Sequence, residues 1–380
     1  MDRALFTGGP AYLVFDGVTF QLHDDWKVDL NLQHFDVKTN LQGTVAKAIS
    51  ENAMAKVTAI PIAFGGSIST AFAKLLPYQP SMRGQFIFPA SDKPLVIQTA
   101  AGKSITFAAA ALTKMPEITF APDKIFFGAV EFTCLIANLA DPSDDDAFLT
   151  IADSAYTEPA LDPLDILFDI FTGVFGASPS APFDGIETDE NGFKFTPTVK
   201  LTPRKTAKNQ TYNFMIDDVT AMVKFTPENV SEEDWKELIR TQGAGYGVGK
   251  LRGSLGDILT IAGSATGKPR LTIPLAAGED GGLRFAQNSR VGEVTLAAHR
   301  KLTSVSKSTG TTSASKSATV GSTTGLTVGM AISGTGISAG TTIAKVVDGT
   351  TLTLSANATA TGTATLTYKS PLFALDIVPA

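Results

Sequence analysis

Short motifs recur in the same order in the two halves of this chain. Val57-Thr58-Ala59 recurs as Val219-Thr220-Ala221, 162 positions later, and Glu131-Phe132-Thr133 recurs as Glu293-Val294-Thr295 at the same offset. A fixed order at nearly one offset indicates that one structural unit occurs twice. We therefore expect two domains of similar fold, in which Val57 is equivalent to Val219 and Glu131 to Glu293. Further matched segments lie between these motifs, at residues 95–107 and 258–273.

Both units are rich in strand signals. Apolar and polar residues alternate in segments such as residues 28–33 and 271–273, as in half-buried strands. Turn dipeptides such as Asp16-Gly17 separate these runs. Helical patterns are few, and the clearest occur once in each half, at residues 69–76 and 231–240. The sequence predicts a mainly β protein with two similar β-sandwich or barrel domains, each with one flanking helix.

A compositionally foreign segment interrupts the second unit. From Thr303 to Ser370, Thr, Ser, Gly and Ala dominate, proline is absent and Asp348 is the only acidic residue. Apolar residues still alternate there, for example Leu352 and Leu354, so the segment can pack a core of its own. We interpret it as a small all-β, Ig-like domain inserted into the last hairpin of the second unit.

The predicted boundaries follow from these shifts in pattern. They are residues 1–155 for the first domain, 156–190 for a linker, 191–302 with 371–380 for the second domain, and 303–370 for the inserted surface domain.

Charge and cysteine content restrict the function. The formal net charge is -6, whereas a protein that grips nucleic acid needs a basic face. Cys134 is the only cysteine, so no disulfide can form within the chain, and a buried apolar role is expected. The first residues lack the apolar core of a signal peptide and no run is long enough to span a membrane, so we expect synthesis in the cytosol.

No catalytic or cofactor motif has the required residues. The glycine-rich segment 243–250 resembles a phosphate loop, but Ala244 stands where that loop needs glycine and Leu251 where it needs Ser or Thr. The acidic cluster Asp141–Asp146 lacks the glycine and alternating ligands of a calcium loop, so a solvated turn is favoured and weak cation binding stays open. We predict no cofactor, no metal site and no enzymatic activity. The three histidines, which share no metal-ligand spacing, are His23, His34 and His299.

Two parts of the chain resemble phage tail components. Residues 325–354 are similar to small β domains carried by phage tail proteins, and the remainder resembles the major tail tube proteins of long-tailed bacteriophages in its element order. The resemblance implies a two-sheet sandwich with one flanking helix and a long hairpin. In that family six domains close a ring, and stacked rings form the tube through which DNA is ejected.

For this chain, the resemblance implies a homotrimer that forms a pseudo-hexameric ring, because each chain carries two domains. It further implies a virion protein of the tail, made and assembled in the bacterial host cytoplasm and not in a membrane. The implied partners are further copies of the chain and the tape-measure, tail-terminator and baseplate proteins. DNA would pass through the lumen without specific binding, past acidic and neutral side chains.

Two polar hairpins are candidates for contacts between stacked rings. They span residues 34–56 and 203–212, and such extended hairpins bury little on their own. Acidic partners on the next ring would be Asp141–Asp146 or Asp189–Glu190; the alternative is that the hairpins are mobile exposed loops. The predicted contact residues are Lys38, Asn40, Gln42, Lys47, Arg204, Lys205 and Lys208.

Two other functions remain open from the sequence. The first is a host-attachment or surface-decoration protein, in which residues 303–370 bind glycan. The second is a glycan hydrolase, which would need two carboxylates at a cleft. The presence of only two tryptophans, Trp26 and Trp235, weighs against an aromatic-lined cleft.

Overall fold

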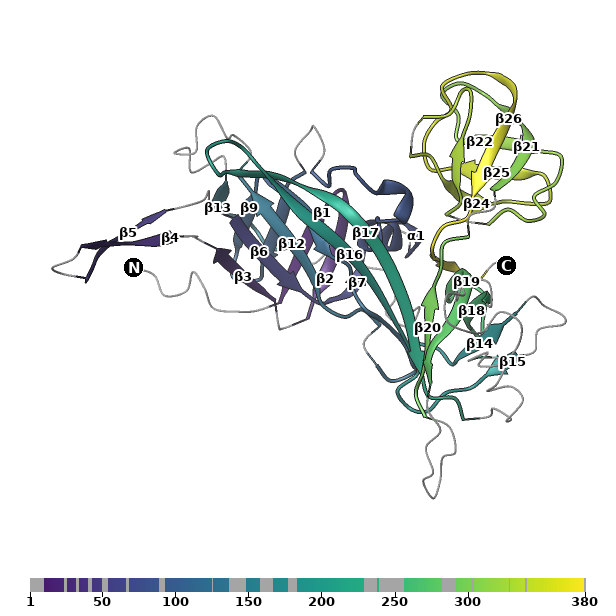
Figure 1. Cartoon of the computed structure of the whole chain (residues 1–380), viewed down its shortest axis with the longest axis horizontal. Coiled ribbons are helices and arrows are strands. Elements are labelled where there is room, and N and C mark those ends of the chain that lie inside the picture. The colour runs from purple at the N-terminus through teal and green to yellow at the C-terminus, as the bar shows by residue number, and fades with distance from the viewer. Residues whose placement is uncertain are drawn as a thin grey trace.

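The computed structural model confirms a mainly β protein built from several antiparallel sheets (Figure 1). It describes residues 10–23, 26–31, 34–39, 43–49, 54–65, 68–88, 93–124, 126–136, 148–157, 167–176, 183–228, 238, 256–281, 292–301, 304–327, 329–338 and 340–378. The predicted helix at residues 69–76 is α1 (Ile68–Leu75). Of the predicted helix at residues 231–240, only Leu238 is described, and it is helical and buried.

The first half is a sandwich of two sheets. One sheet has the order β13-β9-β8-β1-β2-β7 and the other β10-β12-β6-β3. Their strands are β1 (Ala11–Phe15), β2 (Val18–Leu22), β3 (Lys27–Asn31), β6 (Met54–Ala59), β7 (Pro61–Phe64), β8 (Leu95–Thr99), β9 (Lys103–Phe107), β10 (Ala109–Lys114), β12 (Val130–Leu135) and β13 (Leu149–Asp153). Burial alternates along β1 and β2, as the period of two along a strand requires, and in β2 the sequence alternates between apolar and polar residues as well.

The second half forms one large, strongly bent sheet. Its order is β11-β16-β17-β20-β19-β18-β14-β15, with β27 paired to β19. The strands are β11 (Ile118–Phe120), β14 (Phe171–Phe175), β15 (Phe183–Ile186), β16 (Phe193–Lys205), β17 (Thr211–Phe225), β18 (Asp257–Gly263), β19 (Pro269–Gly281), β20 (Val294–Ala298) and β27 (Ala374–Ile377). Strand β11 comes from the first half of the chain.

The order of strand pairing is the same in both halves. The path β2-β1-β8-β9-β13 corresponds to β15-β14-β18-β19-β27, and the path β3-β6-β12-β10 to β16-β17-β20-β19. Strand β19 appears in both paths because its 13 residues cover the positions of β9 and β10, which only Ala108 separates. The predicted match of residues 95–107 with 258–273 is also found in the register: Ile97 pairs with Ile105 as Ile261 pairs with Leu271.

One residue match expected from the sequence is wrong. Strand β20 pairs with β17 only over Met222–Phe225, so Val219 lies outside this pairing. Val294 lies opposite Phe225, as Phe132 lies opposite Val57. Phe225, six residues after Val219, therefore takes the place of Val57 if Glu131 and Glu293 are equivalent. A shift by an even number of residues keeps every side chain on the same face, so a short alternating motif cannot fix the register.

The two halves share one hydrophobic core. Phe120 and Phe126 of the first half contact Phe171 of the second, with the ring centroids of Phe120 and Phe171 5.2 Å apart. Phe195 and Phe373 meet at 5.0 Å. Burial of each such ring contributes about 1.5–3 kcal/mol, so the halves stabilise each other.

The inserted segment is all β and has a separate core, as its alternating apolar residues predict. It forms a single six-stranded sheet, β23-β26-β21-β22-β25-β24, and a bridge between Ala331 and Thr342 brings its two edges together. The result is a nearly closed barrel around Tyr368, whose hydroxyl lies 2.7 Å from Thr309 Oγ1. Its strands are β21 (Ser304–Thr311), β22 (Ser317–Val320), β23 (Ala331–Ser333), β24 (Ile343–Val346), β25 (Thr351–Leu354) and β26 (Gly362–Lys369).

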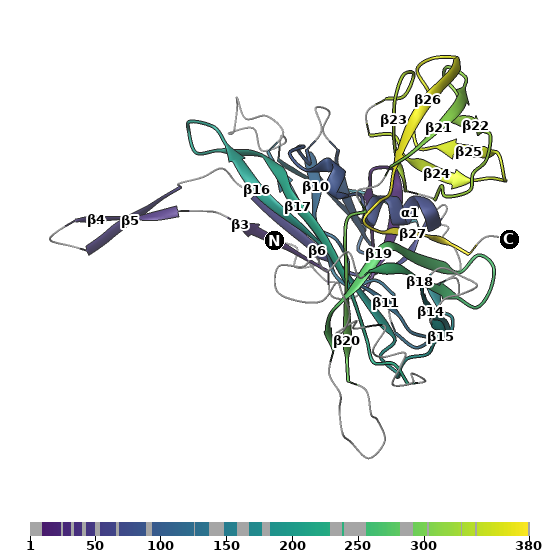
Figure 2. The ribbon, with the colours of Figure 1, turned by 45° about the vertical axis from the view of Figure 1, so that its right-hand side comes forward.

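The inserted barrel begins and ends on neighbouring strands. Ser304 at the start of β21 pairs with Lys369 at the end of β26. The chain then enters β27 through Leu372 and Phe373, whose backbone groups bond to the side chain of Gln79. The barrel therefore stands beside α1 and β27 (Figure 2).

Candidate assembly surface

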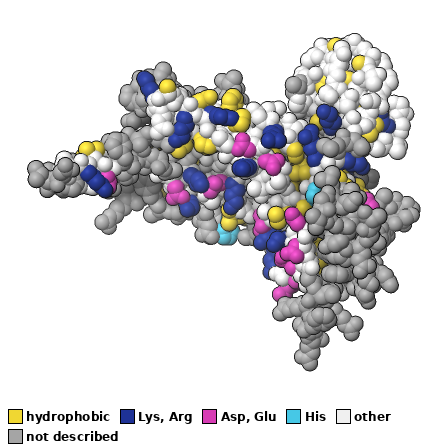
Figure 3. Space-filling model, in the orientation of Figure 1, with side chains coloured by type: hydrophobic (Ala, Val, Ile, Leu, Met, Phe, Trp, Pro, Cys, Tyr) yellow, Lys and Arg dark blue, Asp and Glu magenta, His cyan; other side chains and the backbone are white. Residues whose placement is uncertain are grey.

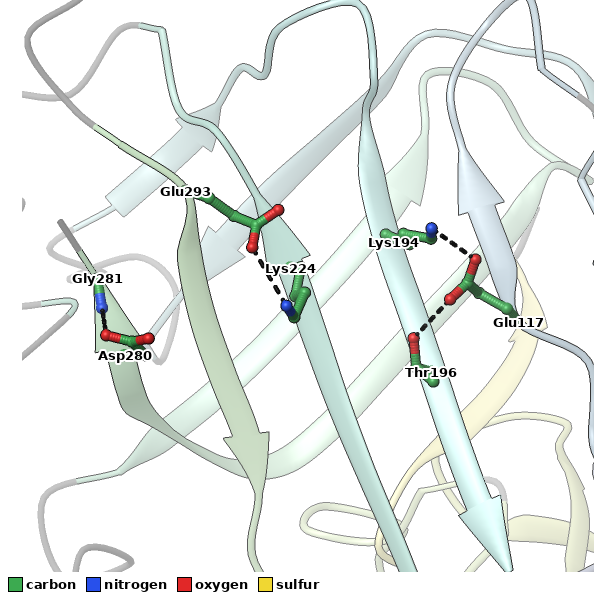
Figure 4. A network of polar contacts seen from close by, with 7 residues as sticks. All are labelled: Glu117, Lys194, Thr196, Lys224, Asp280, Gly281 and Glu293. Carbon is green, nitrogen blue, oxygen red and sulfur yellow. Dashed lines mark hydrogen bonds and ion pairs between the residues drawn. The ribbon is translucent and has the colours of Figure 1, made fainter. Parts of the chain in front are cut away.

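The two halves of the chain meet along a sheet edge. Strand β11 of the first half pairs with β16 of the second, with Ile118 opposite Phe195 and Thr119 opposite Lys194. Glu117, just before β11, binds the second half twice: Oε1 lies 2.9 Å from Lys194 Nζ, and Oε2 accepts a hydrogen bond of 2.9 Å from Thr196 Oγ1 (Figure 4). The seam therefore combines backbone pairing, apolar packing and an ion pair.

A second segment of the first half pairs with β17. Gly84 N donates to Ile216 O at 2.8 Å, and Ile87 N donates to Phe214 O at 3.0 Å. The side-chain amide of Asn213 bonds both backbone groups of Phe88, accepting at 3.1 Å and donating at 3.0 Å. These contacts supply hydrogen-bond partners to the edge of β17 beyond the point where β20 ends. The first half therefore contacts both strands of the β16–β17 hairpin.

The counterpart hairpin of the first half has no such cover. Strand β3 pairs only with β6 in the described part of the chain, and the strands β4 (His34–Thr39) and β5 (Gly43–Ile49) pair only with each other. Figures 1 and 2 show the β4–β5 ribbon projecting away from the body, on the same side as the tip of the β16–β17 hairpin. An unpaired edge of this kind can accept a strand from another chain.

The exposed face of the sheets that contain β6 and β17 carries lysines paired with glutamates. Lys56 Nζ lies 3.1 Å from Glu131 Oε2, and Lys224 Nζ lies 3.2 Å from Glu293 Oε1. Together with the Glu117–Lys194 pair, these contacts neutralise charge locally across both halves. Figure 3 shows basic and acidic side chains interspersed on the side of the molecule in view.

The predicted contact residues lie at two hairpin tips, where the structure describes them. On β4, Lys38 Nζ lies 4.0 Å from Asp36 Oδ2. Lys47 belongs to β5, but its side chain is outside the part that the structure describes. Asn40, Gln42 and the cluster Asp141–Asp146 lie outside the described residues.

The second tip is better defined. Arg204 and Lys205 end β16, and Arg204 Nη2 lies 2.9 Å from Met215 Sδ. Lys208 lies in the turn that follows, where its backbone N–H donates to Thr206 Oγ1. The acidic turn at Asp189–Glu190 precedes β16, at the opposite end of the same long strand.

Other kinds of site find little support. Among the described residues, no cluster of His, Cys, Asp and Glu could hold a metal ion, and no helix is long and apolar enough to cross a membrane. Burial raises the pKa of the Cys134 thiol, so it stays protonated and acts as a small apolar side chain. His23 has a buried Nδ1 with no hydrogen-bond partner among the described residues, and His299 lies after β20, where its backbone N–H donates to Leu275 O.

Sequence reasoning missed the seam between the halves. Its signal is the alternating Ile118-Thr119-Phe120, two positions after Pro116, a short strand that pairs with a distant part of the chain. Comparison of the sequence with protein-family models and with curated proteins gives no match.

Proposed function

We propose that this chain is the structural protein of a phage tail tube, assembling as rings of three chains that stack into a conduit for DNA. The observation that supports this most is the seam between the halves: in two units with one strand order, β11 of the first pairs with β16 at the edge of the second. Repeating this junction between chains would extend the sheet around an axis until it closes, and a closed sheet has no free edge.

The sheet face with paired charges is proposed to line the channel. Three lysines on it, Lys56, Lys194 and Lys224, each have a glutamate within 3.2 Å. A phosphate that reached one of these lysines would have to displace the glutamate, so few counterions would be released and binding would be weak. Such a lining lets a polyanion pass, although it contains these three lysines.

Stacking is proposed to use the two ends of the β16–β17 hairpin. The basic residues Arg204, Lys205 and Lys208 cluster at the tip, and Asp189–Glu190 lies at the base. The 13 residues of β16 span about 40 Å at about 3.3 Å per residue. A ring of this height would present a basic rim to the acidic rim of the next ring. The β4–β5 ribbon, with Lys38 and Lys47, projects on the same side as the basic tip.

The inserted barrel is proposed to decorate the outside of the tube. It is held beside α1 and β27 and has a core of its own, so it leaves the charged sheet face uncovered. In this function the chain is part of the virion tail, with tape-measure, tail-terminator and baseplate proteins as further partners.

Electron microscopy of the purified full-length protein tests this function. Hollow tubes with a three-fold repeat in each ring are expected. Isolated spikes would instead favour the alternative, a host-attachment or surface-decoration protein whose inserted barrel binds glycan. Rings of six chains would contradict the proposed trimer but would still support a tube.

A further inference from the structure

We propose that the free edge of β3 is the docking site for residues 283–285 of a second copy of this chain. That segment would flank β3 as β11 flanks β16 inside one chain. The inference rests on the proposed ring and names the residues that join its subunits.

The ion pairs fix which residues of the two hairpins are equivalent. Lys56 pairs with Glu131 as Lys224 pairs with Glu293, so Lys56 on β6 takes the place of Lys224 on β17. The cross-strand partner of Lys56 is Asp29, and that of Lys224 is Lys194.

One position further along, Ala55 pairs with Leu30 as Val223 pairs with Phe195. Leu30 is therefore the counterpart of Phe195, and Asp29 the counterpart of Lys194.

These two apolar counterparts differ sharply in exposure. Phe195, which lies opposite Ile118 of β11 and packs on Phe373, is 0% exposed, while Leu30 is 57% exposed. A leucine this open on the free edge of a strand, at a position that is covered in the other half, indicates a missing neighbouring strand. Among the described residues, only the second half receives that cover.

The sequence contains a second copy of the covering strand. Residues 283–285 lie outside the part of the chain that the structure describes, but Leu283-Arg284-Phe285 repeats the apolar-polar-apolar pattern of Ile118-Thr119-Phe120. It follows β19 shortly after Gly281, as β11 follows β10.

The charges at the two positions are complementary. Thr119 lies opposite Lys194, so the counterpart Arg284 of a second copy would lie opposite Asp29. At the seam within the chain, Lys194 is neutralised by Glu117. At the seam between chains the signs are reversed, with an acidic residue on the hairpin and a basic one on the covering strand.

Strand β3 and strand β19 belong to different sheets of the chain. Strand β3 is the edge of the sheet β10-β12-β6-β3, whereas β19 lies in the separate sheet that begins with β11 and β16. Figure 1 shows β3 and β19 at opposite ends of the body. Residues 283–285, which begin two positions after β19 in the sequence, would therefore reach β3 of a neighbouring chain instead of β3 of their own.

Disulfide trapping tests the pairing directly. Chains carrying Asp29→Cys are mixed with chains carrying Arg284→Cys under mild oxidation, and covalent dimers of the two are expected on a non-reducing gel, because opposed strand positions suit disulfide geometry. Each variant alone is the control, since Cys134 is buried. Absence of mixed dimers from rings of normal appearance would overturn the proposal, as would an internal disulfide in the double variant.

Charge exchange is the second test. Asp29→Arg and Arg284→Asp should each shift the protein from rings to monomers in size-exclusion chromatography with light scattering, and the double variant should recover rings. Leu30→Asp should also lose rings, whereas Val347→Asp, a similarly open site (49% exposed) on the inserted barrel, should keep them. If the wild-type protein forms no ring at all, the proposed function fails; if rings form and resist all three changes, only this interface fails.

Discussion

Lys224 forms an ion pair with Glu293, with 3.2 Å between Nζ and Oε1, at the position where Lys56 and Glu131 form one at 3.1 Å in the first half. The same pair of residue types on equivalent strands of each unit is stronger evidence that the two halves are equivalent than the short sequence motifs are. It also sets the register from which Leu30 and Phe195 are recognised as counterparts.

Removing the two glutamates should make the assembled protein retain DNA. In the variant Glu131→Gln with Glu293→Gln, Lys56 and Lys224 lose their partners, which adds two unpaired lysines per chain. Each lysine that then neutralises a phosphate should add about 0.9 to the slope of log affinity against log salt. Binding of duplex DNA to assembled tubes, measured at several salt concentrations, checks this.

The matched control changes net charge equally, at residues that take no part in the three lysine–glutamate pairs of this face. Asp123→Asn with Asp153→Asn alters a turn and the edge strand β13 of the other sheet. If this control retains DNA as strongly as the glutamine variant, the charged face does not line the channel.

Reversing the charge at the hairpin tip should stop stacking but leave rings. Arg204→Glu with Lys208→Glu places acidic residues where the next ring is proposed to present Asp189 and Glu190, and like charges repel. We expect soluble rings and no tubes in electron microscopy. Adding Asp189→Lys and Glu190→Lys should restore tubes; rings that stack normally without this compensation would contradict the proposed stacking.

Shortening the ribbon at residues 39–51 tests the other hairpin. The β4–β5 ribbon makes no strand pairing with the rest of the described chain, so its loss should leave the fold intact. Rings that do not polymerise are expected, and normal tubes from this variant would remove Lys38 and Lys47 from the stacking contact.

The order of elements could be predicted from the sequence, but the register and the seam could not. The recurring Glu131-Phe132-Thr133 motif located equivalent strands, because its glutamate is held by the same lysine contact in both halves. The motif Val57-Thr58-Ala59 gave the wrong residue match, because many alternating triplets fit either register equally well. The domain boundaries at residues 155, 190, 302 and 371 stay predictions.

Long-range pairing explains the other omissions. Strand β11 has three residues, and its partner β16 begins 73 positions after its end, so no local pattern links Phe120 to Phe193. The inserted segment was recognised by its composition and alternation. Those patterns determine neither the number of sheets nor the Ala331–Thr342 bridge that nearly closes its barrel.

The ion pair between Arg270 and Asp376 should stabilise the return of the chain from the inserted barrel. Arg270 donates to both carboxylate oxygens, at 2.9 Å from Nε and 2.6 Å from Nη2, and so holds β27 on β19. Asp376→Asn should lower the free energy of unfolding by about 1–3 kcal/mol, since hydrogen bonds to charged groups are of this size. Urea unfolding measures it. The exposed pair of Lys124 and Asp123 is the control, and Asp123→Asn should change stability by less than about 0.5 kcal/mol.

Acid should weaken the turn that joins β1 and β2. Asp16 lies there with a positive φ of 49° and accepts from Lys74 Nζ at 2.5 Å and Lys93 Nζ at 2.6 Å. Burial raises the pKa of Asp16, but the hydrogen bonds and charges of the two lysines outweigh it, so the net shift is downward. A lowered pKa in the folded state means that the contribution to stability is fully present above the unfolded pKa of about 3.9 and is lost as pH falls through the folded pKa.

The variant Asp16→Asn isolates this contribution, because asparagine tolerates positive φ and keeps the turn. Its melting temperature should lie below that of the wild-type protein near pH 6, and the difference should shrink as pH falls below about 3.9. The control is Asp123→Asn, because the Asp123 carboxylate pairs with exposed Lys124 at the surface. This variant should differ little from the wild-type protein across the same range. A difference for Asp16→Asn that stays constant from about pH 6 to about pH 2 would show that the turn depends on the shape of Asp16 and not on its charge.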